Sequence, residues 1–181
     1  MADSTAPLGT PLATVEAAPP LAMLTLRADL AAPETAAAVQ AATGQGVPGT
    51  RGLSWQDGRG AAWMAPDELM LLLPPEAAAE AQAAARTALG ESFATLVDVS
   101  DARAAFRLTG PRADEVLMKL APVDLARFPE GEIRRSRAGQ VAVAFWRSGP
   151  QEITLVCFRS VADYMLGLLA TAAAPGGEVF P

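Results

Sequence analysis

Few residues of this chain have types and spacings that could support chemistry, and the strongest group is a short acidic cluster. Asp98, Ser100 and Asp101 place two carboxylates and a hydroxyl within four positions. A metal or catalytic site would need further ligands or a base at a useful spacing, and the sequence provides none. We therefore interpret the cluster as turn and capping residues between two strands. The sequence predicts no catalytic, cofactor-binding or metal-binding residue.

Histidine is absent from the 181 residues, and a single cysteine is present. The commonest general base and the usual metal ligand are therefore missing, which disfavours a self-contained hydrolase or a zinc enzyme. Cys157 lies in the apolar run 155–158 of an expected strand, so we interpret it as an unreactive core thiol. One cysteine cannot form an internal disulfide and is typical of a reducing compartment.

A glycine-rich segment at 44–49 matches the G-x-G-x-x-G pattern of dinucleotide-binding loops. That pattern requires a preceding strand and a following helix. Here the segment follows an expected helix, and Pro48 would interrupt the start of a second one. We therefore predict a flexible loop at 44–49 and no dinucleotide site.

Arginines and tryptophans offer contact surfaces instead of reactive groups. One expected strand carries Arg134, Arg135 and Arg137. These arginines form either a solvated edge that resists aggregation or a contact for an acidic partner. Other expected strands carry Trp55, Trp63 and Trp146. Core packing accounts for the tryptophans in one interpretation, and in the other Trp55 or Trp63 faces a partner.

The composition is typical of a soluble globular protein, with 51% apolar and 19% charged residues. The net charge of −6 disfavours nucleic-acid binding, which requires a basic surface. No apolar run reaches the ~18 residues of a membrane span. The first 20 residues contain four prolines and no basic segment, unlike a secretory signal. We expect a cytoplasmic protein that contacts neither membrane nor nucleic acid.

The segment 98–120 contains a strand, a break and a helix, and it positions the acidic cluster. Apolar and polar residues alternate over 104–109, which predicts a strand with one buried face. Gly110 and Pro111 end this strand and begin a helix over 112–121. On that helix we expect Glu115 and Lys119 to form an exposed ion pair.

The remaining pattern predicts an α+β fold with an internal duplication. Residues 21–92 and 93–172 each contain the order strand, helix, three strands, helix, so we predict two β-α-β-β-β-α halves in one domain at 21–172. The halves would join their sheets, with helices on the faces. Residues 1–20 are expected to form an extended tail that lies along a partner, and 173–181 a C-terminal tail. The last helix is expected to begin at Ser160, with Asp163 in a capping box.

Three stretches of the sequence resemble the sarcosine oxidase gamma subunit family in their residues and in their order along the chain. Residues 97–117, VDVSDARAAFRLTGPRADEVL, are similar to the central signature of the family. Residues 62–71, AWMAPDELML, are similar to its W-L-G-P-D-E-W-L-L block, with Ala65 where glycine is usual. Residues 122–125 and 128–131, PVDL and FPEG, match its P-L-D-L … F-P-x-G segment. The similarity runs from about residue 10 to Leu169.

This resemblance implies both a fold and a function. The fold would be similar to that of aminomethyltransferase and YgfZ-like folate-binding proteins. The chain would be a non-catalytic gamma subunit that supports oxidative demethylation of sarcosine to glycine by large flavoprotein subunits. Its partners would be the alpha, beta and delta subunits. FAD, FMN, NAD and tetrahydrofolate would belong to those partners, and the isolated chain would be inactive and would self-associate.

Two alternatives stay open from the sequence. One is a free-standing folate-binding or one-carbon protein. It would need a pocket between the halves with a carboxylate that reaches the pterin, for which Asp98 and Asp101 are the nearest candidates. The other is a stand-alone dimerising domain without a small-molecule role.

Overall fold

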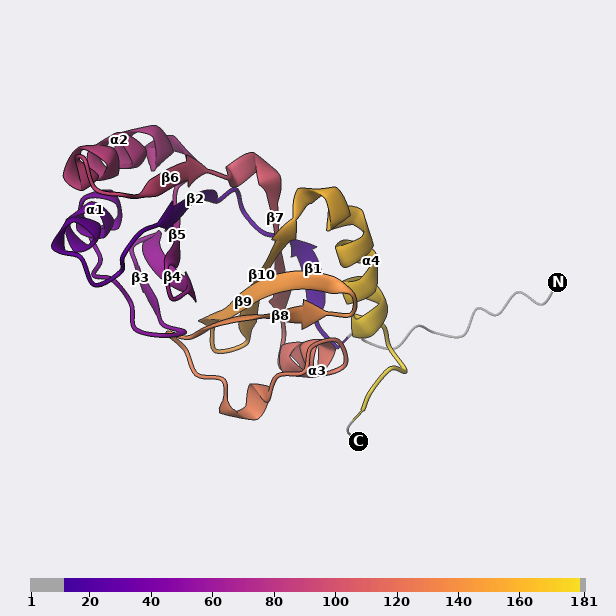
Figure 1. The fold of residues 1–181 in the computed structure, drawn as a ribbon. Helices are drawn as coiled ribbons and strands as arrows, with labels where there is room; N and C mark the ends of the chain where they lie inside the picture. Colours follow the sequence, from indigo (N-terminus) through magenta and orange to yellow (C-terminus); the bar gives the residue numbers. More distant parts are fainter. Residues whose placement is uncertain (1–11, 180–181) are drawn as a thin grey trace.

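Two five-stranded antiparallel sheets face each other, and helices cover their outer faces. The computed structural model describes residues 12–179. Helices α1 and α2 lie outside one sheet, while α3 and α4 lie outside the other (Figure 1). The predicted α+β class, with helices on the faces of a sheet core, is confirmed. None of the helices within 12–179 is long and apolar enough to cross a membrane.

The first half follows the predicted order of elements and ends in one further strand. Its sheet has the order β3-β4-β5-β2-β6. The elements are β2 (Ala22–Arg27), α1 (Pro33–Thr43), β3 (Leu53–Gln56), β4 (Arg59–Ala65), β5 (Glu68–Leu73), α2 (Ala78–Leu89) and β6 (Thr95–Asp98). Asp57 and Gly58 both have positive φ, 52° and 78°, and form the tight turn between β3 and β4 that an Asp-Gly pair favours in a hairpin.

The second half repeats this topology. Its sheet has the order β8-β9-β10-β7-β1, in which each strand matches its counterpart in the first sheet. The elements are β7 (Arg103–Thr109), α3 (Ala113–Met118), β8 (Ile133–Ala138), β9 (Val141–Gly149), β10 (Glu152–Phe158), α4 (Ala162–Ala173) and, from the start of the chain, β1 (Thr14–Ala17). The predicted duplication of a β-α-β-β-β-α unit is therefore confirmed.

The N-terminal segment completes the second sheet, so the expectation of an extended tail over 1–20 is wrong for residues 14–17. Strand β1 pairs with β7, from Thr14 opposite Thr109 to Ala17 opposite Phe106. Pairing satisfies backbone groups of β7 that an exposed edge would leave open. Beside the residues that precede this strand, Gly110 ends β7 at φ 142°, a backbone conformation that glycine adopts more readily than other residues. Residues 1–11 of the expected tail lie outside the described residues.

The boundary between the halves falls later than the predicted division at 92/93. Strand β6 pairs with β2, with Leu96 opposite Leu26 and Asp98 opposite Leu24. Residues 95–98 therefore belong to the first sheet, although their alternation looks continuous with the strand that follows. The 3-10 turn at 100–102 then redirects the chain into β7 and the second sheet.

Two helices begin or end differently from the prediction. Helix α3 ends at Met118 instead of residue 121. Helix α4 is preceded by a 3-10 turn and begins at Ala162, and no side-chain cap from Ser160 is formed. The predicted capping box is therefore wrong, because the turn at 159–161 already occupies the positions that the box would use.

The C-terminal segment packs against α3, which rules out the expected Glu115–Lys119 pair. Lys119 donates hydrogen bonds from Nζ to the carbonyl oxygens of Ala172 and Gly177. The Glu115 carboxylate is buried, forms an ion pair with Arg112 at 2.7 Å and accepts a hydrogen bond from the Val179 N–H. Both side chains thus bind residues of the predicted tail at 173–181. Residues 180–181 of that tail lie outside the described residues.

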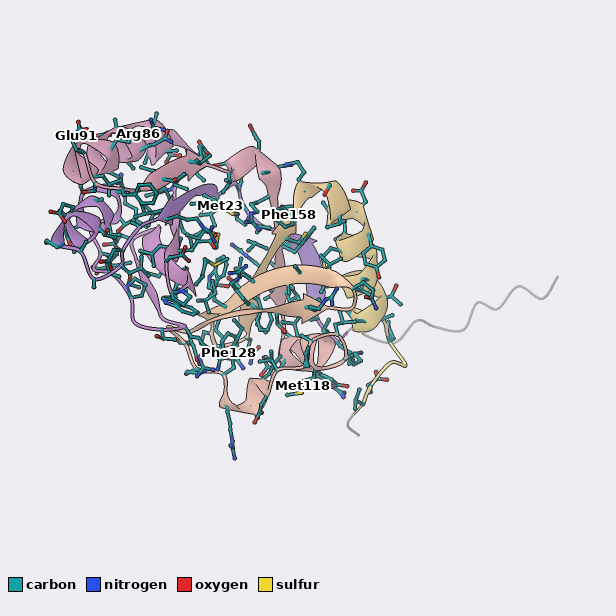
Figure 2. All side chains as sticks on the ribbon, in the orientation of Figure 1. Met23, Arg86, Glu91, Met118, Phe128 and Phe158 are labelled. Atoms are coloured by element: carbon teal, nitrogen blue, oxygen red, sulfur yellow. The ribbon has the colours of Figure 1, made fainter. Side chains whose placement is uncertain are left out.

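Three apolar clusters follow from the alternation along the strands. One fills the space under α1 and α2, and a second fills the space under α3 and α4. The third lies between the sheets and contains Met23, Met70, Leu72 and Trp146. Figure 2 labels Met23 in this region between the halves. The central strands β5 and β10 are therefore buried on both faces, as their continuous apolar runs predict.

Candidate functional site

A groove of about 1000 Å³ opens between the two sheets, and we call it the tryptophan groove. Its volume and largely apolar lining fall within the range of ligand or peptide sites in proteins. Both halves contribute to it, through strands β3, β7, β9 and β10. Residues that define it include Leu53, Trp55, Pro74, Arg107, Trp146 and Glu152.

The two tryptophans of the groove differ in exposure. Trp146 is 4% exposed and belongs to the cluster between the sheets, whereas Trp55 is 45% exposed. Gly60 of β4 lies directly under the Trp55 ring, and a Cβ there would be 2.7 Å from its Cε3 atom. Glycine therefore lets the indole lie flat against the neighbouring strand. Trp63 instead packs under the helices of the first half, so only Trp55 fits the expectation of a tryptophan that faces outward.

Part of the polar lining of the groove is paired, although among residues 12–179 the buried Nε of Arg107 has no hydrogen-bond acceptor. Arg107 forms an ion pair with Glu152 at 3.5 Å. The hydroxyls of Ser148 and Thr154 lie 2.9 Å apart, and either can be the donor. Among the described residues of the groove, no base lies beside a nucleophile, as acyl or phosphoryl transfer would require. The arrangement can hold an apolar or aromatic group of another molecule, with the ion pair as a polar margin.

The acidic cluster forms a turn and lies outside the groove. The backbone N–H of Ser100 donates to the Oδ1 of Asp98 at 2.9 Å, and its hydroxyl bonds to the same atom at 2.5 Å. The Ser100 hydroxyl also accepts a hydrogen bond from the Met23 N–H at 2.9 Å. The interpretation as turn residues is confirmed. Neither Asp98 nor Asp101 lines the tryptophan groove, so the carboxylates proposed for a pterin are elsewhere.

Cys157 is fully buried under the helices of the second half. Burial raises the pKa of its thiol, and the charge of Arg103 opposes this only in part. The thiol lies 3.4 Å from the carbonyl oxygen of Phe158, which can accept its weak hydrogen bond. Because a raised pKa lowers the fraction of thiolate, these surroundings suit the unreactive thiol expected from the sequence.

The arginines of β8 occupy an edge strand, but they do not form one basic surface. Arg134 pairs with Glu132 and stacks on the ring of Phe128. Arg135 points toward the first half, where it donates to the Met64 carbonyl oxygen at 2.8 Å. The alternation of a strand explains this division, because neighbouring side chains point to opposite faces.

The glycine-rich segment at 44–49 is the loop predicted from its context. Gly44 adopts φ 71° and caps α1, with its N–H donating to the Gln40 carbonyl oxygen at 2.8 Å. The chain then continues into β3, and no helix begins in this segment. The helix N-terminus that a dinucleotide phosphate would need does not follow this loop.

Sequence reasoning missed two arginines that the fold places at important contacts. Arg147 of β9 forms two hydrogen bonds to the Asp114 carboxylate, at 2.8 and 2.7 Å. Arg103 of β7 lies over the Phe158 ring at 4.4 Å. No local pattern marks either residue, since each contact joins segments that are far apart in the sequence.

Among residues 12–179, no group of three or more potential metal ligands lies close enough together to hold an ion. The candidate sites of the described residues are therefore the tryptophan groove and the contacts of the arginines.

The comparisons with known proteins agree on one family. The model of the sarcosine oxidase gamma subunit family matches residues 27–175, which is most of the chain. The chain belongs to the sarcosine oxidase gamma subunit family. A curated member, sarcosine oxidase subunit gamma of Corynebacterium sp. strain P-1, is 32% identical over 140 residues, which cover 75% of this chain and 68% of that protein. The resemblance inferred from the three sequence stretches is thus confirmed.

Solved structures of relatives share the fold of this gamma-family chain. A chain of the heterotetrameric sarcosine oxidase from Corynebacterium sp. U-96 matches with a TM-score of 0.80 and 27% identity, covering 89% of this chain and 83% of that one. The aminomethyltransferase T of the glycine cleavage system from Bartonella henselae matches with a TM-score of 0.67 and 12% identity, covering 88% and 46%. At that identity the second match shows a common fold only, and it confirms the predicted similarity to aminomethyltransferases.

Proposed function

We propose that this chain is the gamma subunit of a heterotetrameric sarcosine oxidase and works as an assembly component of that complex. The family match over residues 27–175 carries the proposal, because it covers both halves of the fold. The matching chain of a solved heterotetrameric sarcosine oxidase supports it. In this role the chain supports the oxidative demethylation of sarcosine to glycine without contributing reactive groups.

The partners proposed are the alpha, beta and delta subunits. FAD, FMN, NAD and tetrahydrofolate are assigned to those subunits. The chemistry of the tryptophan groove supports this division, since Arg107 pairs with Glu152, Arg147 pairs with Asp114, and the hydroxyls of Ser148 and Thr154 bond to each other. An exposed indole in an apolar groove is also typical of a residue that anchors a protein contact.

Co-expression tests the proposal. The full chain is produced together with the alpha, beta and delta subunits, and the complex is isolated through a tag on alpha. We expect the gamma chain to co-purify, and the chain produced alone to be colourless and inactive with sarcosine. An isolated complex that is active but retains no gamma chain contradicts the proposal.

A free-standing folate-binding protein is the alternative, and it would need a carboxylate of the groove to reach the pterin. The carboxylates facing the tryptophan groove are Glu76, Glu130 and Glu152, instead of the expected Asp98 and Asp101. Titration calorimetry of the isolated chain with tetrahydrofolate separates the two functions. We expect no heat of binding for an assembly component, and sub-millimolar binding would favour the alternative.

A further inference from the structure

Two arginines pair with one carboxylate at a rim of the space between the sheets, and a third arginine lies near them. Glu68 of β5 forms ion pairs with Arg27 at 3.3 Å and with Arg135 at 3.8 Å. Arg103 of β7 lies close enough to Glu68 and Arg135 for both charges to act on it. We call this group of Arg27, Glu68, Arg103 and Arg135 the arginine rim.

The arginine rim is distinct from the tryptophan groove. Arg103 and Arg107 lie on the same face of β7, four residues apart, which corresponds to about 13 Å along a strand. Arg107 lines the tryptophan groove, and Arg103 does not. The space between the sheets thus has an apolar groove toward Arg107 and a cationic rim toward Arg103.

Positive charge exceeds negative charge at the rim. Arg27 and Arg135 share the Glu68 carboxylate and Arg103 lies near it, which leaves an excess of positive charge among these four side chains on a chain whose net charge is −6. The Arg27 and Arg135 side chains are 55% and 52% exposed, so both remain accessible from solvent. Such a patch attracts carboxylates locally, although the net negative charge of the protein repels them.

Arg103 has spare binding capacity at this rim. Its guanidinium lies over the ring of Phe158, and among the described residues its Nε is buried without a hydrogen-bond acceptor. The Phe158 ring is 50% exposed. Figure 2 labels Phe158 near the end of β10, beside the space between the halves. The ring holds the guanidinium plane in place, and a fixed plane suits bidentate binding of a carboxylate.

We propose that the arginine rim docks an acidic polypeptide segment of another subunit, with Arg103 binding a carboxylate and Phe158 packing against its side chain. This inference rests on the proposed function as an assembly component. Charge complementarity determines the choice of occupant, because Arg27 and Arg135 converge on Glu68 and Arg103 lies near it. The mixture of an exposed phenylalanine with arginines fits a protein contact, in which aromatic and arginine residues are enriched.

Charge-reversal variants in the assembled complex test the docking. The full chain is co-expressed with the alpha, beta and delta subunits, and the amount of gamma relative to alpha is measured after purification. Arg103→Glu is expected to lower this ratio about tenfold, because it replaces attraction by repulsion at the contact. Arg127→Glu is the matched control, since Arg127 is 89% exposed and pairs only with nearby Asp124 among the described ion pairs. We expect the wild-type ratio for this control.

A conservative variant separates geometry from charge. Arg103→Lys keeps the positive charge but loses the planar fork, so we expect an intermediate ratio between those of the wild type and Arg103→Glu. Circular dichroism and thermal melting of each isolated chain check that the variants fold. If Arg103→Glu does not fold, Arg103→Lys alone decides, and a ratio equal to the wild type would overturn the docking.

A peptide probe tests the same site without the complex. A fluorescein-labelled hexaglutamate peptide is titrated with the isolated full chain, and its anisotropy is followed. We expect binding that weakens about tenfold for Arg103→Glu and falls as NaCl rises from about 0.05 M to about 0.5 M, as screened charges require. A hexalysine peptide is the control and should bind no better to wild type than to the variant.

The outcomes distinguish the two proposals. If wild-type gamma does not co-purify at all, the proposed function fails. The peptide titration then still tests whether the arginine rim binds an acidic segment. If wild-type gamma co-purifies and Arg103→Glu does so equally, the docking inference is wrong. Equal binding of hexaglutamate to both chains also overturns it. A salt-sensitive homodimer that Arg103→Glu abolishes would assign the rim to a second copy instead, which contradicts the proposed partner.

Discussion

Cys157 and Arg103 lie on neighbouring positions of the paired strands β10 and β7, and each alters the charge environment of the other. Burial raises the pKa of the thiol and lowers that of the guanidinium, since both charged forms lose contact with water. Arginine stays charged despite this shift, because its ordinary pKa is far above neutrality. The same desolvation therefore makes the cysteine inert and leaves the arginine as a binding group.

The pH dependence of stability provides a prediction for Cys157. Its folded pKa is raised above the ordinary value of 9.0, so the protonated thiol favours folding. This contribution is complete below pH 9.0 and is lost as the pH rises through the folded pKa. Urea unfolding at about pH 8 and about pH 10 should therefore show a larger loss for wild type than for Cys157→Ala. Equal losses in the two chains would contradict the prediction.

At the scale of elements, one arginine connects α3 and the following loop to the second sheet. Arg147 of β9 binds Asp114 of α3 through both terminal nitrogens. It also donates to the carbonyl oxygens of Phe128 at 2.7 Å and Leu125 at 3.0 Å. This side chain is 13% exposed, so few water molecules can replace its N–H donors at these oxygens if it is lost.

Replacement of Arg147 by lysine tests this connection. Arg147→Lys keeps the charge but cannot reproduce the bidentate pair together with two carbonyl contacts, so we expect a loss of about 2 to 4 kcal/mol in the free energy of unfolding. Arg127→Lys is the control, because its exposed ion pair at 3.6 Å should contribute less than about 1 kcal/mol. Urea denaturation measures both. Similar small losses in the two variants would show that Arg147 is not a structural connection.

At the scale of the whole molecule, the second sheet takes its last strand from the start of the chain. Strand β1 occupies the place in this sheet that β6 occupies in the first. Leu12 and Ala13 are buried, and the Leu12 N–H donates to the Ala173 carbonyl oxygen at 2.9 Å. The N-terminal segment thus connects the end of α4 to the edge of β7, and the second half is complete only when both ends of the chain are present.

A chain that begins at Ala18 should therefore be less stable and more prone to associate. Removing Leu12 alone from the core would cost about 2 to 5 kcal/mol, and the freed edge of β7 can pair with another molecule. Thermal melting and size-exclusion chromatography measure the two effects. Glu16→Ala is the control, since this residue is exposed within β1 and its replacement leaves the strand backbone in place. An unchanged melting temperature in the shortened chain would contradict the role of β1.

Local patterns predicted most elements of both halves, because each strand or helix is selected by its own alternation and turn residues. The Asp57-Gly58 turn and the Asp98–Ser100 turn are of this kind, since their hydrogen bonds and φ angles involve residues close in sequence. The duplication follows from the order of such elements, and the family resemblance follows from three local stretches of sequence. Local patterns also predicted the burial of Cys157, whose neighbours in the strand are apolar.

Only the tertiary structure decided which strands share a sheet and which side chains meet between the sheets. Strand β1 has four residues and no strong alternation, so its pairing depends on an open edge of β7 that appears only after the second half has folded. The arginine rim likewise brings together residues 27, 68, 103 and 135. Contacts of this range depend on how two finished sheets pack, and no spacing within one segment encodes them.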